Sequence, residues 1–230
     1  MATRPVYVPV LNGAHPGVKV FQVDFHWFPG LSLSQKKKSI ASLHESAESL
    51  GIVPVLEVSS KSEEDLGVSL SAFNLMITTP GKNRVFSVES AFQGSKVFEK
   101  GGPYIDLLEK SSREAKKDIR LKESGDLVEF RFFNKGFPIS PRTFFYDWLY
   151  INALFKKSDL VLAASQYKGF TDIEFNPKKS INCQAYALAL AVSLHFHGFS
   201  GRVSDPDEFL KVAYPNEDVG KEQSVQSQLF

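Results

Sequence analysis

The feature that most constrains the fold is an aromatic helical segment of about fifteen residues that begins at Ser140-Pro141. One stripe of this expected helix carries Phe144, Trp148, Ile151 and Phe155. An adjacent stripe carries Phe145, Leu149 and Asn152. Two neighbouring stripes of this kind indicate a helix that is buried on more than one side. Such a helix must lie within the core, so other elements have to pack around it.

The chain is long enough to build a core of that kind. At 230 residues it is near the upper limit for a single core, and a domain of this size buries roughly 70–75% of its unfolded surface. Its 20 Phe, 7 Tyr and 2 Trp require either a large core or a site at which planar ligands stack. The sequence is compatible with both.

The first 65 residues have the pattern of strands and one helix. Tyr7–Leu11 is typical of a β-strand, and so is Val18–Phe28, where apolar and polar residues alternate. Ser34 is expected to cap a helix that ends at Gly51, and Val53–Ser59 is expected to form another strand. These residues therefore predict an N-terminal strand-helix-strand extension.

The remaining segments mix strands and helices. A strand or loop is expected at Val68–Ile77 and a strand at Leu127–Phe133. Helices are expected at Ser87–Glu99, at Ser111–Lys122 with a capping box, and at Asn182–His197. This order predicts an α+β fold with helices packed around a small mixed sheet.

We predict three parts in the chain. Residues 1–65 form the extension, which is docked on a core domain at residues 66–200. Residues 201–230 form a polar tail, and the composition after Asp205 need not fold.

Charge and cysteine content exclude several classes of protein. Lys and Arg number 27 against 26 Asp and Glu, which argues against a protein that coats nucleic acid nonspecifically, although a local basic groove remains possible. Cys183 is the only cysteine, so no intrachain disulfide can form. The N-terminus lacks a signal-peptide pattern, and the apolar stretch Cys183–Leu194 is too short to span a bilayer. We expect a cytoplasmic protein that does not bind membranes.

No metal or cofactor is predicted. His195 and His197 would point about 160° apart on a helix, so they are poorly placed to share an ion. The chain also lacks the glycine-rich fingerprint of a Rossmann site and the lysine loop of a P-loop.

Three polar residues in the expected helix Ser87–Glu99 are the first candidates for a site. Steps of four and seven residues place Glu89, Gln93 and Lys96 on one helix face, whereas the other side is more apolar. The competing interpretation is that Glu89 and Lys96 are surface charges, weakly paired through solvent. Spacing alone does not separate these interpretations.

The surrounding sequence resembles a known family. Residues 87–98 read Ser-Val-Glu-Ser-Ala-Phe-Gln-Gly-Ser-Lys-Val-Phe, which is similar to the signature of the NADAR family. Residues 70–73 resemble the strand that precedes this signature in the family, and residues 112–116 followed by Arg120 resemble its Ala-Lys and Arg segment. Further similarities lie at residues 171–176 and 180–182.

The resemblance covers about residues 66–198, which implies that the core domain is the catalytic one. More closely, the chain resembles the NADAR antitoxins that are paired with DarT-type toxins, which ADP-ribosylate guanine bases in DNA. The resemblance implies an N-glycosidase that removes ADP-ribose from guanosine in DNA. Alternatives are an N-glycosidase of a ribosylamino-pyrimidine phosphate in riboflavin metabolism, and a noncatalytic module that binds ADP-ribose or the toxin.

This reading assigns roles to individual residues. The catalytic candidates are Glu89, Asp172 and Lys96. The substrate-binding candidates are Gln93, Phe73, Ser71, Phe175, Asn182, Lys116 and Arg120. Cleavage of an anomeric C–N bond passes through a cationic state that needs a carboxylate nearby and an acid for the leaving nitrogen. Glu89 and Asp172 could fill these roles in either order, and Lys96 could clamp phosphate or attack the opened sugar.

Overall fold

The computed structural model describes residues 1–81 and 84–215. Its strands are β1 (Ala2–Pro9), β2 (Val18–Phe25), β3 (Val55–Glu57), β4 (Met76–Thr78), β5 (Val85–Ser87), β6 (Lys96–Phe98), β7 (Leu127–Phe132), β8 (Lys135–Phe137) and β9 (Gly169–Thr171). Its helices are α1 (Leu33–Ser49), α2 (Asp65–Ser69), α3 (Val88–Gly94), the 3-10 helix η1 (Ile105–Glu109), α4 (Ser112–Lys117), α5 (Arg120–Glu123), α6 (Phe144–Phe155), α7 (Ser158–Ala164), α8 (Gln184–Phe196) and α9 (Pro206–Ala213). The predicted α+β class is confirmed.

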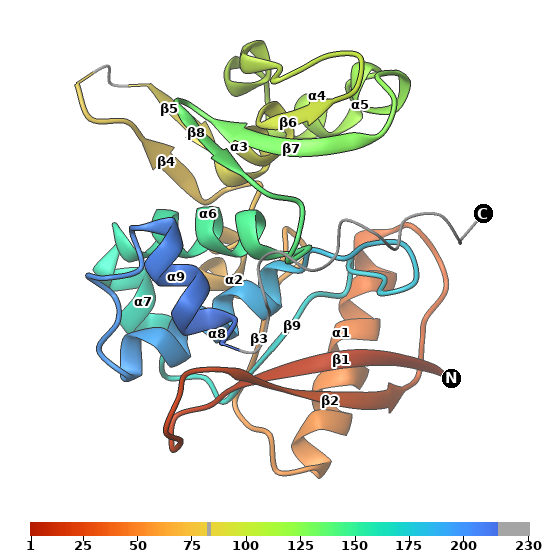
Figure 1. The fold of residues 1–230 in the computed structure, drawn as a ribbon. Helices are drawn as coiled ribbons and strands as arrows, with labels where there is room; N and C mark the ends of the chain where they lie inside the picture. The colour runs from red at the N-terminus through yellow and green to blue at the C-terminus, as the bar shows by residue number, and fades with distance from the viewer. Residues whose placement is uncertain (82–83, 216–230) are drawn as a thin grey trace, which may run out of the picture.

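The strands form three small sheets. One is mixed, with the order β2-β1-β9-β3, in which β9 is antiparallel to β1 and parallel to β3. The others are the hairpin β4-β5 and the antiparallel sheet β6-β7-β8. In Figure 1 the mixed sheet with α1 lies at the bottom and the two smaller sheets lie at the top, with α6 and α8 between them.

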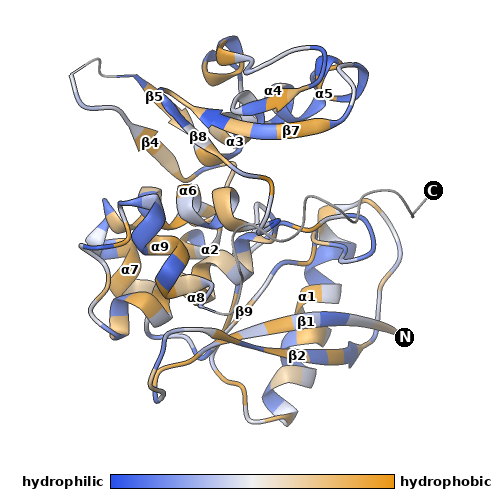
Figure 2. Cartoon of the chain, in the orientation of Figure 1, coloured by the Kyte–Doolittle hydropathy of each residue, from blue (hydrophilic) through white to orange (hydrophobic). Residues whose placement is uncertain are grey.

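The aromatic helix α6 occupies the centre of the core, as its two apolar stripes predict. Phe145, Leu149 and Ile151 are at most 2% exposed, and α6 packs against α3, α7, α8 and α9. Figure 2 shows hydrophobic residues along α7 and α8, whereas hydrophobic and hydrophilic residues alternate in bands along α1. Because α6 is covered from several directions, it can be apolar nearly all round.

The N-terminal residues join the same sheet as the rest of the chain. Tyr7 of β1 pairs with Phe170 of β9, and α1 packs its apolar face on β1 and β2 through a second cluster of buried residues that includes Leu43 and Phe25. The same cluster includes Ile173, so β1, β2, α1 and β3 pack against β9 and the start of the segment that follows it. The division at residue 65 stays a prediction.

Several predicted boundaries are wrong. Ser32, not Ser34, caps α1 by accepting a hydrogen bond from the backbone N–H of Gln35. The expected strand or loop at Val68–Ile77 contains the end of helix α2 and the start of β4. These short elements lack the long periodic pattern that identifies a helix or strand from sequence.

The helix predicted at Ser87–Glu99 ends at Gly94, and residues 96–98 form β6 instead. Lys96 pairs with Phe130 of β7, and the backbone N–H of Arg131 donates to the Ser95 carbonyl oxygen at 2.7 Å. The strand is favoured because this pairing satisfies backbone groups that a longer helix would have to satisfy itself. Lys96 therefore does not share a helix face with Glu89.

The chain after Asp205 folds further than predicted. Asp205 caps α9, and Phe209 in this helix is fully buried against the core. The rest of the predicted tail, residues 216–230, lies outside the described residues. Within residues 1–81 and 84–215, no helix is both long and apolar enough to cross a membrane.

Candidate active site

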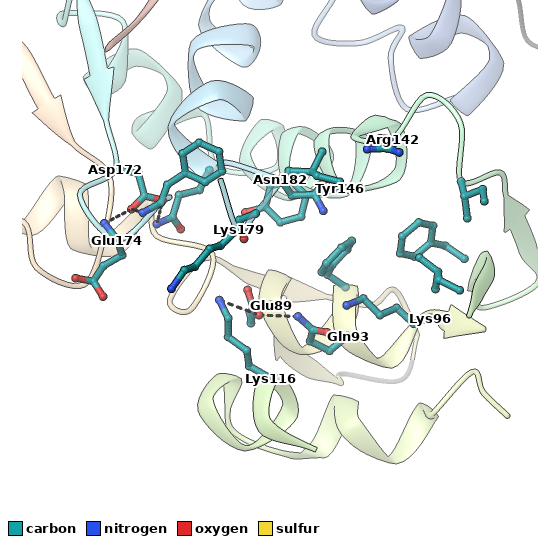
Figure 3. A pocket seen from close by; sticks show the side chains of 18 of the residues that line it. Glu89, Gln93, Lys96, Lys116, Arg142, Tyr146, Asp172, Glu174, Lys179 and Asn182 are labelled. Atoms are coloured by element: carbon teal, nitrogen blue, oxygen red, sulfur yellow. Dashed lines mark hydrogen bonds and ion pairs between the residues drawn. The ribbon is translucent and has the colours of Figure 1, made fainter. Parts of the chain in front are cut away.

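A cavity of about 890 Å³ opens between α3, the start of α6 and the segment that connects β9 to α8. The predicted site residues that line it are Glu89, Gln93, Lys96, Lys116, Phe73, Asp172, Phe175 and Asn182. In Figure 3, Asp172 and Glu174 lie at one end, Arg142 and Lys96 lie at the other, and Glu89 lies between them. The fold thus brings together residues that are more than 100 positions apart.

Glu89 is held in the first turn of α3, where a carboxylate is stabilised by the helix dipole. The residue is 5% exposed, and its Oε1 accepts a hydrogen bond from Gln93 Nε2 at 2.9 Å. The backbone N–H of Glu89 donates to the Ala72 carbonyl oxygen at 2.9 Å. The predicted four-residue spacing of Glu89 and Gln93 on one helix face is confirmed.

Lys116 reaches the same carboxylate from α4. Its Nζ lies 3.6 Å from Glu89 Oε1 and 5.2 Å from the centre of the Phe73 ring. Ser112, the first residue of α4, donates its hydroxyl to the Phe73 carbonyl oxygen at 2.9 Å, which ties the helix to the cavity wall. The ammonium of Lys116 and the carboxyl group of Glu89 therefore form an ion pair in the cavity wall.

Lys96 lines the cavity from β6. Its Nζ lies 4.9 Å from the centre of the Phe92 ring. The pKa of Lys96 is lowered to about 8, mainly by burial; the charge of Glu89 opposes this shift and the charge of Lys116 contributes to it. A larger share of this amine is therefore uncharged near neutral pH than for an exposed lysine.

Asp172 follows β9 and is held by three N–H donors. Oδ1 accepts from the backbone N–H groups of Glu174 at 3.0 Å and Phe175 at 3.2 Å, and Oδ2 accepts from Gln184 Nε2 at 3.0 Å. Gln184 also accepts a hydrogen bond from the backbone N–H of Ala72 at 2.7 Å. This amide therefore joins α8, the segment after β9 and the segment before α3.

Two amide oxygens in the cavity wall are buried without partners. Gln93 Oε1 and Asn182 Oδ1 make no hydrogen bond within the described residues. A buried acceptor that is left unpaired costs about 1–3 kcal/mol. Donors on a bound molecule, such as sugar hydroxyls, would remove this cost after a small movement of either side chain.

The two predicted stacking residues differ in exposure. Phe73 is partly exposed, whereas Phe175 is 8% exposed and belongs to the hydrophobic core. Both line the cavity. Phe73 therefore has more ring surface available for a planar ligand.

Ser71 and Arg120 do not line the cavity, so the structure does not bring these two predicted residues to the site. Ser71 is fully buried and donates its hydroxyl to the Val68 carbonyl oxygen at 2.8 Å. Arg120 forms ion pairs with Asp106 and Asp118, and these hydrogen bonds lower the pKa of both carboxyls. Its guanidinium is therefore already occupied by acidic partners.

The residue candidates from the sequence omitted several residues that line the cavity, among them the polar residues Arg142, Tyr146 and Gln184. Burial and the charge of Glu89 raise the pKa of Tyr146, so its hydroxyl stays protonated and can donate a hydrogen bond. Gln184 carries a usable signal, since it is a polar residue in the first turn of an otherwise apolar helix. No local pattern distinguishes Tyr146 from the core aromatics around it.

The described part of the chain, residues 1–81 and 84–215, contains no group of three or more His, Cys, Asp or Glu side chains that could hold a metal ion. The polar groups of the cavity are instead carboxylates, amides, a phenol and amines. This set can hold a sugar phosphate and move protons.

Comparison with known proteins identifies the family. The family model of DarT1-associated NADAR antitoxins matches residues 2–223, including the first 65 residues that the sequence motifs did not cover. No curated protein matches the sequence. The family match spans nearly the whole chain and confirms the resemblance seen in the motifs. The chain therefore belongs to the DarT1-associated NADAR antitoxin family.

Proposed function

We propose that this antitoxin is an N-glycosidase that removes ADP-ribose from ADP-ribosylated guanosine in DNA, and so reverses the modification made by a DarT-type toxin. Family membership supports the association with DarT1. The observation that carries the chemistry is the nearly buried Glu89 carboxylate in the wall of a cavity of about 890 Å³. Cavities of roughly 300–1,000 Å³ accommodate ligands of nucleotide size.

Glu89 is proposed to act on the anomeric carbon of ADP-ribose through its side-chain oxygens. Gln93 and Lys116 both contact Oε1, and no hydrogen bond within the described residues engages Oε2. Oε2 is therefore available to activate water or to stabilise the cationic sugar. Asp172, at the other wall, is proposed to stabilise the same cation or to hold the ribose hydroxyls.

The remaining contacts are assigned by chemistry. Gln93 and Asn182 would accept hydrogen bonds from ribose hydroxyls through their unpaired amide oxygens. Phe73 would stack on the base, since this residue is partly exposed and lines the cavity. Lys116 and Arg142 would bind phosphate groups, because ammonium and guanidinium ions both pair with phosphate oxygens.

The test is the release of ADP-ribose, followed by chromatography, from a DNA oligonucleotide that carries ADP-ribosylated guanosine. We expect the native protein to release ADP-ribose in the presence of a chelator and to leave unmodified DNA. Binding without release would support the noncatalytic module. If the protein cleaved the N-glycosidic bond of a ribosylamino-pyrimidine phosphate and released no ADP-ribose from DNA, the riboflavin-pathway alternative would be supported.

A lysine variant separates the two roles of Lys96. Burial lowers the pKa of this amine to about 8, which favours its attack on the anomeric carbon of ADP-ribose. The bond to the guanine nitrogen breaks, that nitrogen takes up a proton and stays in the DNA, and opening of the sugar ring then gives an imine with Lys96. Hydrolysis of the imine would then release ADP-ribose. We expect borohydride, added during turnover, to give a protein heavier by reduced ADP-ribose, and Lys96→Arg to give no adduct and to lose activity by about 10²-fold or more.

Lys100→Arg provides the control, because Lys100 is exposed after β6 and does not line the cavity. This variant should form the adduct at the native rate. Retention of activity by Lys96→Arg, together with no adduct in the native protein, would instead show that Lys96 serves as a cation that holds phosphate.

A further inference from the structure

A buried polar cluster lies behind the cavity, on the side of the mixed sheet. It consists of Glu57 on β3, Ser59, Thr171 on β9 and His44 on α1. Glu57 is 2% exposed and does not line the cavity. Its carboxyl group lies 2.6 Å from the Ser59 hydroxyl and 2.7 Å from the Thr171 hydroxyl, and Thr171 Oγ1 lies 2.9 Å from His44 Nε2.

This cluster holds the backbone on both sides of Asp172. The Thr171 hydroxyl bonds to Glu57 Oε2, and the backbone N–H of Ile173 donates to Glu57 Oε1 at 2.9 Å. Thr171 and Ile173 are the two chain neighbours of Asp172. Glu57 therefore helps to set the direction in which the Asp172 carboxylate enters the cavity wall.

Glu57 and Asp172 are both buried, and a charge on Glu57 disfavours a charge on Asp172. Burial raises the pKa of each carboxyl, and the charge of Glu57 raises the pKa of Asp172 further. Near neutral pH the pair is expected to hold one proton between them.

The hydrogen-bond partners decide which carboxyl holds that proton. All three partners of Asp172 are N–H donors, which cannot accept a hydrogen bond from a protonated acid. Two partners of Glu57 are hydroxyls, which can accept as well as donate. A proton on Glu57 Oε2 can be donated to Thr171, whose hydroxyl then donates to His44 Nε2. Burial lowers the pKa of His44 to about 4, so the ring is neutral, and Nε2 accepts in the tautomer that carries its proton on Nδ1.

We propose that Glu57 is a positioning residue that carries the proton of the Glu57–Asp172 pair and thereby keeps Asp172 ionised and correctly oriented in the cavity wall. The catalytic consequence rests on the proposed function. The location of the proton does not, because it follows from the burial of the two carboxyls and from their hydrogen bonds.

The other charged groups around the cluster are already paired. Glu174, beside Asp172, forms an ion pair with Lys36 at 3.0 Å. Glu63, whose charge acts on His44, forms an ion pair with Lys37 at 3.3 Å. On the far side of Asp172, burial raises the pKa of Tyr7 and of Cys183, so both stay neutral. Neither Glu57 nor Asp172 forms an ion pair with a lysine or arginine among the described residues.

The first experiment locates the proton in the native protein. Glutamate carboxyl carbons are labelled with ¹³C, which separates Glu57 from the buried aspartates, and carboxyl resonances are followed by NMR from about pH 5 to pH 8. We expect one glutamate carboxyl to keep the chemical shift of a protonated acid over this range, and its resonance to be missing in Glu57→Gln. Ionisation of every glutamate at pH 7, or a protonated Asp172 in aspartate-labelled protein, would overturn the proposal.

The second experiment measures the catalytic consequence. Gln at position 57 reproduces a protonated acid, since its amide nitrogen can donate to Thr171 and its oxygen can accept from Ile173. We expect Glu57→Ala to lower kcat/KM on the order of tenfold or more through misplacement of Asp172, and Glu57→Gln to restore most of the loss. Equal losses in the two variants, with native circular dichroism, would show that a negative charge on Glu57 is required. If the native protein released no ADP-ribose, the proposed function would fail, while the labelling experiment would still decide the position of the proton.

Discussion

Glu89→Gln is expected to lower the rate constant of ADP-ribose release by about 10²–10⁴-fold while the protein still folds and binds substrate. Gln is nearly the same size as Glu and can keep the contact with Gln93 through its amide oxygen. It cannot take a proton from water and carries no charge to stabilise the cationic sugar. The measurement is single-turnover release with saturating protein, alongside titration binding of the same modified oligonucleotide.

Glu123→Gln is the matched control for this prediction, because Glu123 is an exposed residue of α5 outside the cavity. Its rate should equal that of the native protein. Native release by Glu89→Gln would remove Glu89 from the catalytic group. Loss of binding together with release would instead point to a role in forming the site.

Asp147→Asn is expected to stabilise the protein above neutral pH. Asp147 is fully buried in α6, Oδ2 accepts from the Tyr214 hydroxyl at 2.6 Å, and Oδ1 makes no hydrogen bond within the described residues. Burial raises the pKa of Asp147 to about 7. The folded protein therefore keeps this proton at pH values at which the unfolded chain has lost it.

The sign of the pH dependence follows from this difference. A carboxyl whose folded pKa lies above its unfolded value of about 4 contributes stability that is complete below pH 4 and is lost as the pH rises to about 7. Asn has no charge to bury, so we expect Asp147→Asn to raise the free energy of unfolding by about 1–3 kcal/mol at pH 8 and by little at pH 5.

Urea unfolding at the two pH values gives the measurement. The difference in the free energy of unfolding between the variant and the native protein reports on Asp147 alone, because the Glu57–Asp172 pair and His44 titrate in both proteins. The exposed Asp159→Asn serves as control and should give no gain at pH 8. An equal effect of Asp147→Asn at pH 5 and pH 8 would contradict a buried carboxyl with a raised pKa.

Asp147 lies next to the cavity, so its effect on stability concerns the same part of α6 that forms the site. The neighbouring residue Tyr146 lines the cavity, while Tyr214, which follows α9, bonds to both Asp147 and Thr143. Phe209 of α9 stacks on Phe144 with 6.0 Å between ring centres. Helix α9 and Tyr214 therefore pack against α6 next to the residue that lines the cavity.

Local signals in the sequence were reliable where a few neighbouring residues decide the outcome. The capping box of Ser111 and Glu114 is present at the start of α4. Helix α8 ends at Phe196, one residue before the predicted end at His197, and Gly198 follows at φ 77°. The aromatic stripes of α6 predicted its central burial, because its two apolar faces could be shielded from water only inside the core.

Elements whose formation depends on distant partners were missed. Strand β6 forms because Lys96 and Val97 pair with Phe130 and Glu129, about thirty positions later. Helix α9 is held by burial of Phe209, although the composition around it is polar. The residues next to β6 and α9 in the sequence do not predict either interaction.

The sequence by itself determined the α+β class, the family resemblance and the pairing of Glu89 with Gln93, because spacing along one helix is a local property. Only the tertiary structure decided which other groups meet them. It brings Asp172 and Lys96 to one cavity from β9 and β6, and engages Arg120 with acidic partners outside it. The physical reason is that contacts between residues far apart in the sequence depend on how the sheets and helices pack. That packing is determined by the burial of the whole core and not by neighbouring residues.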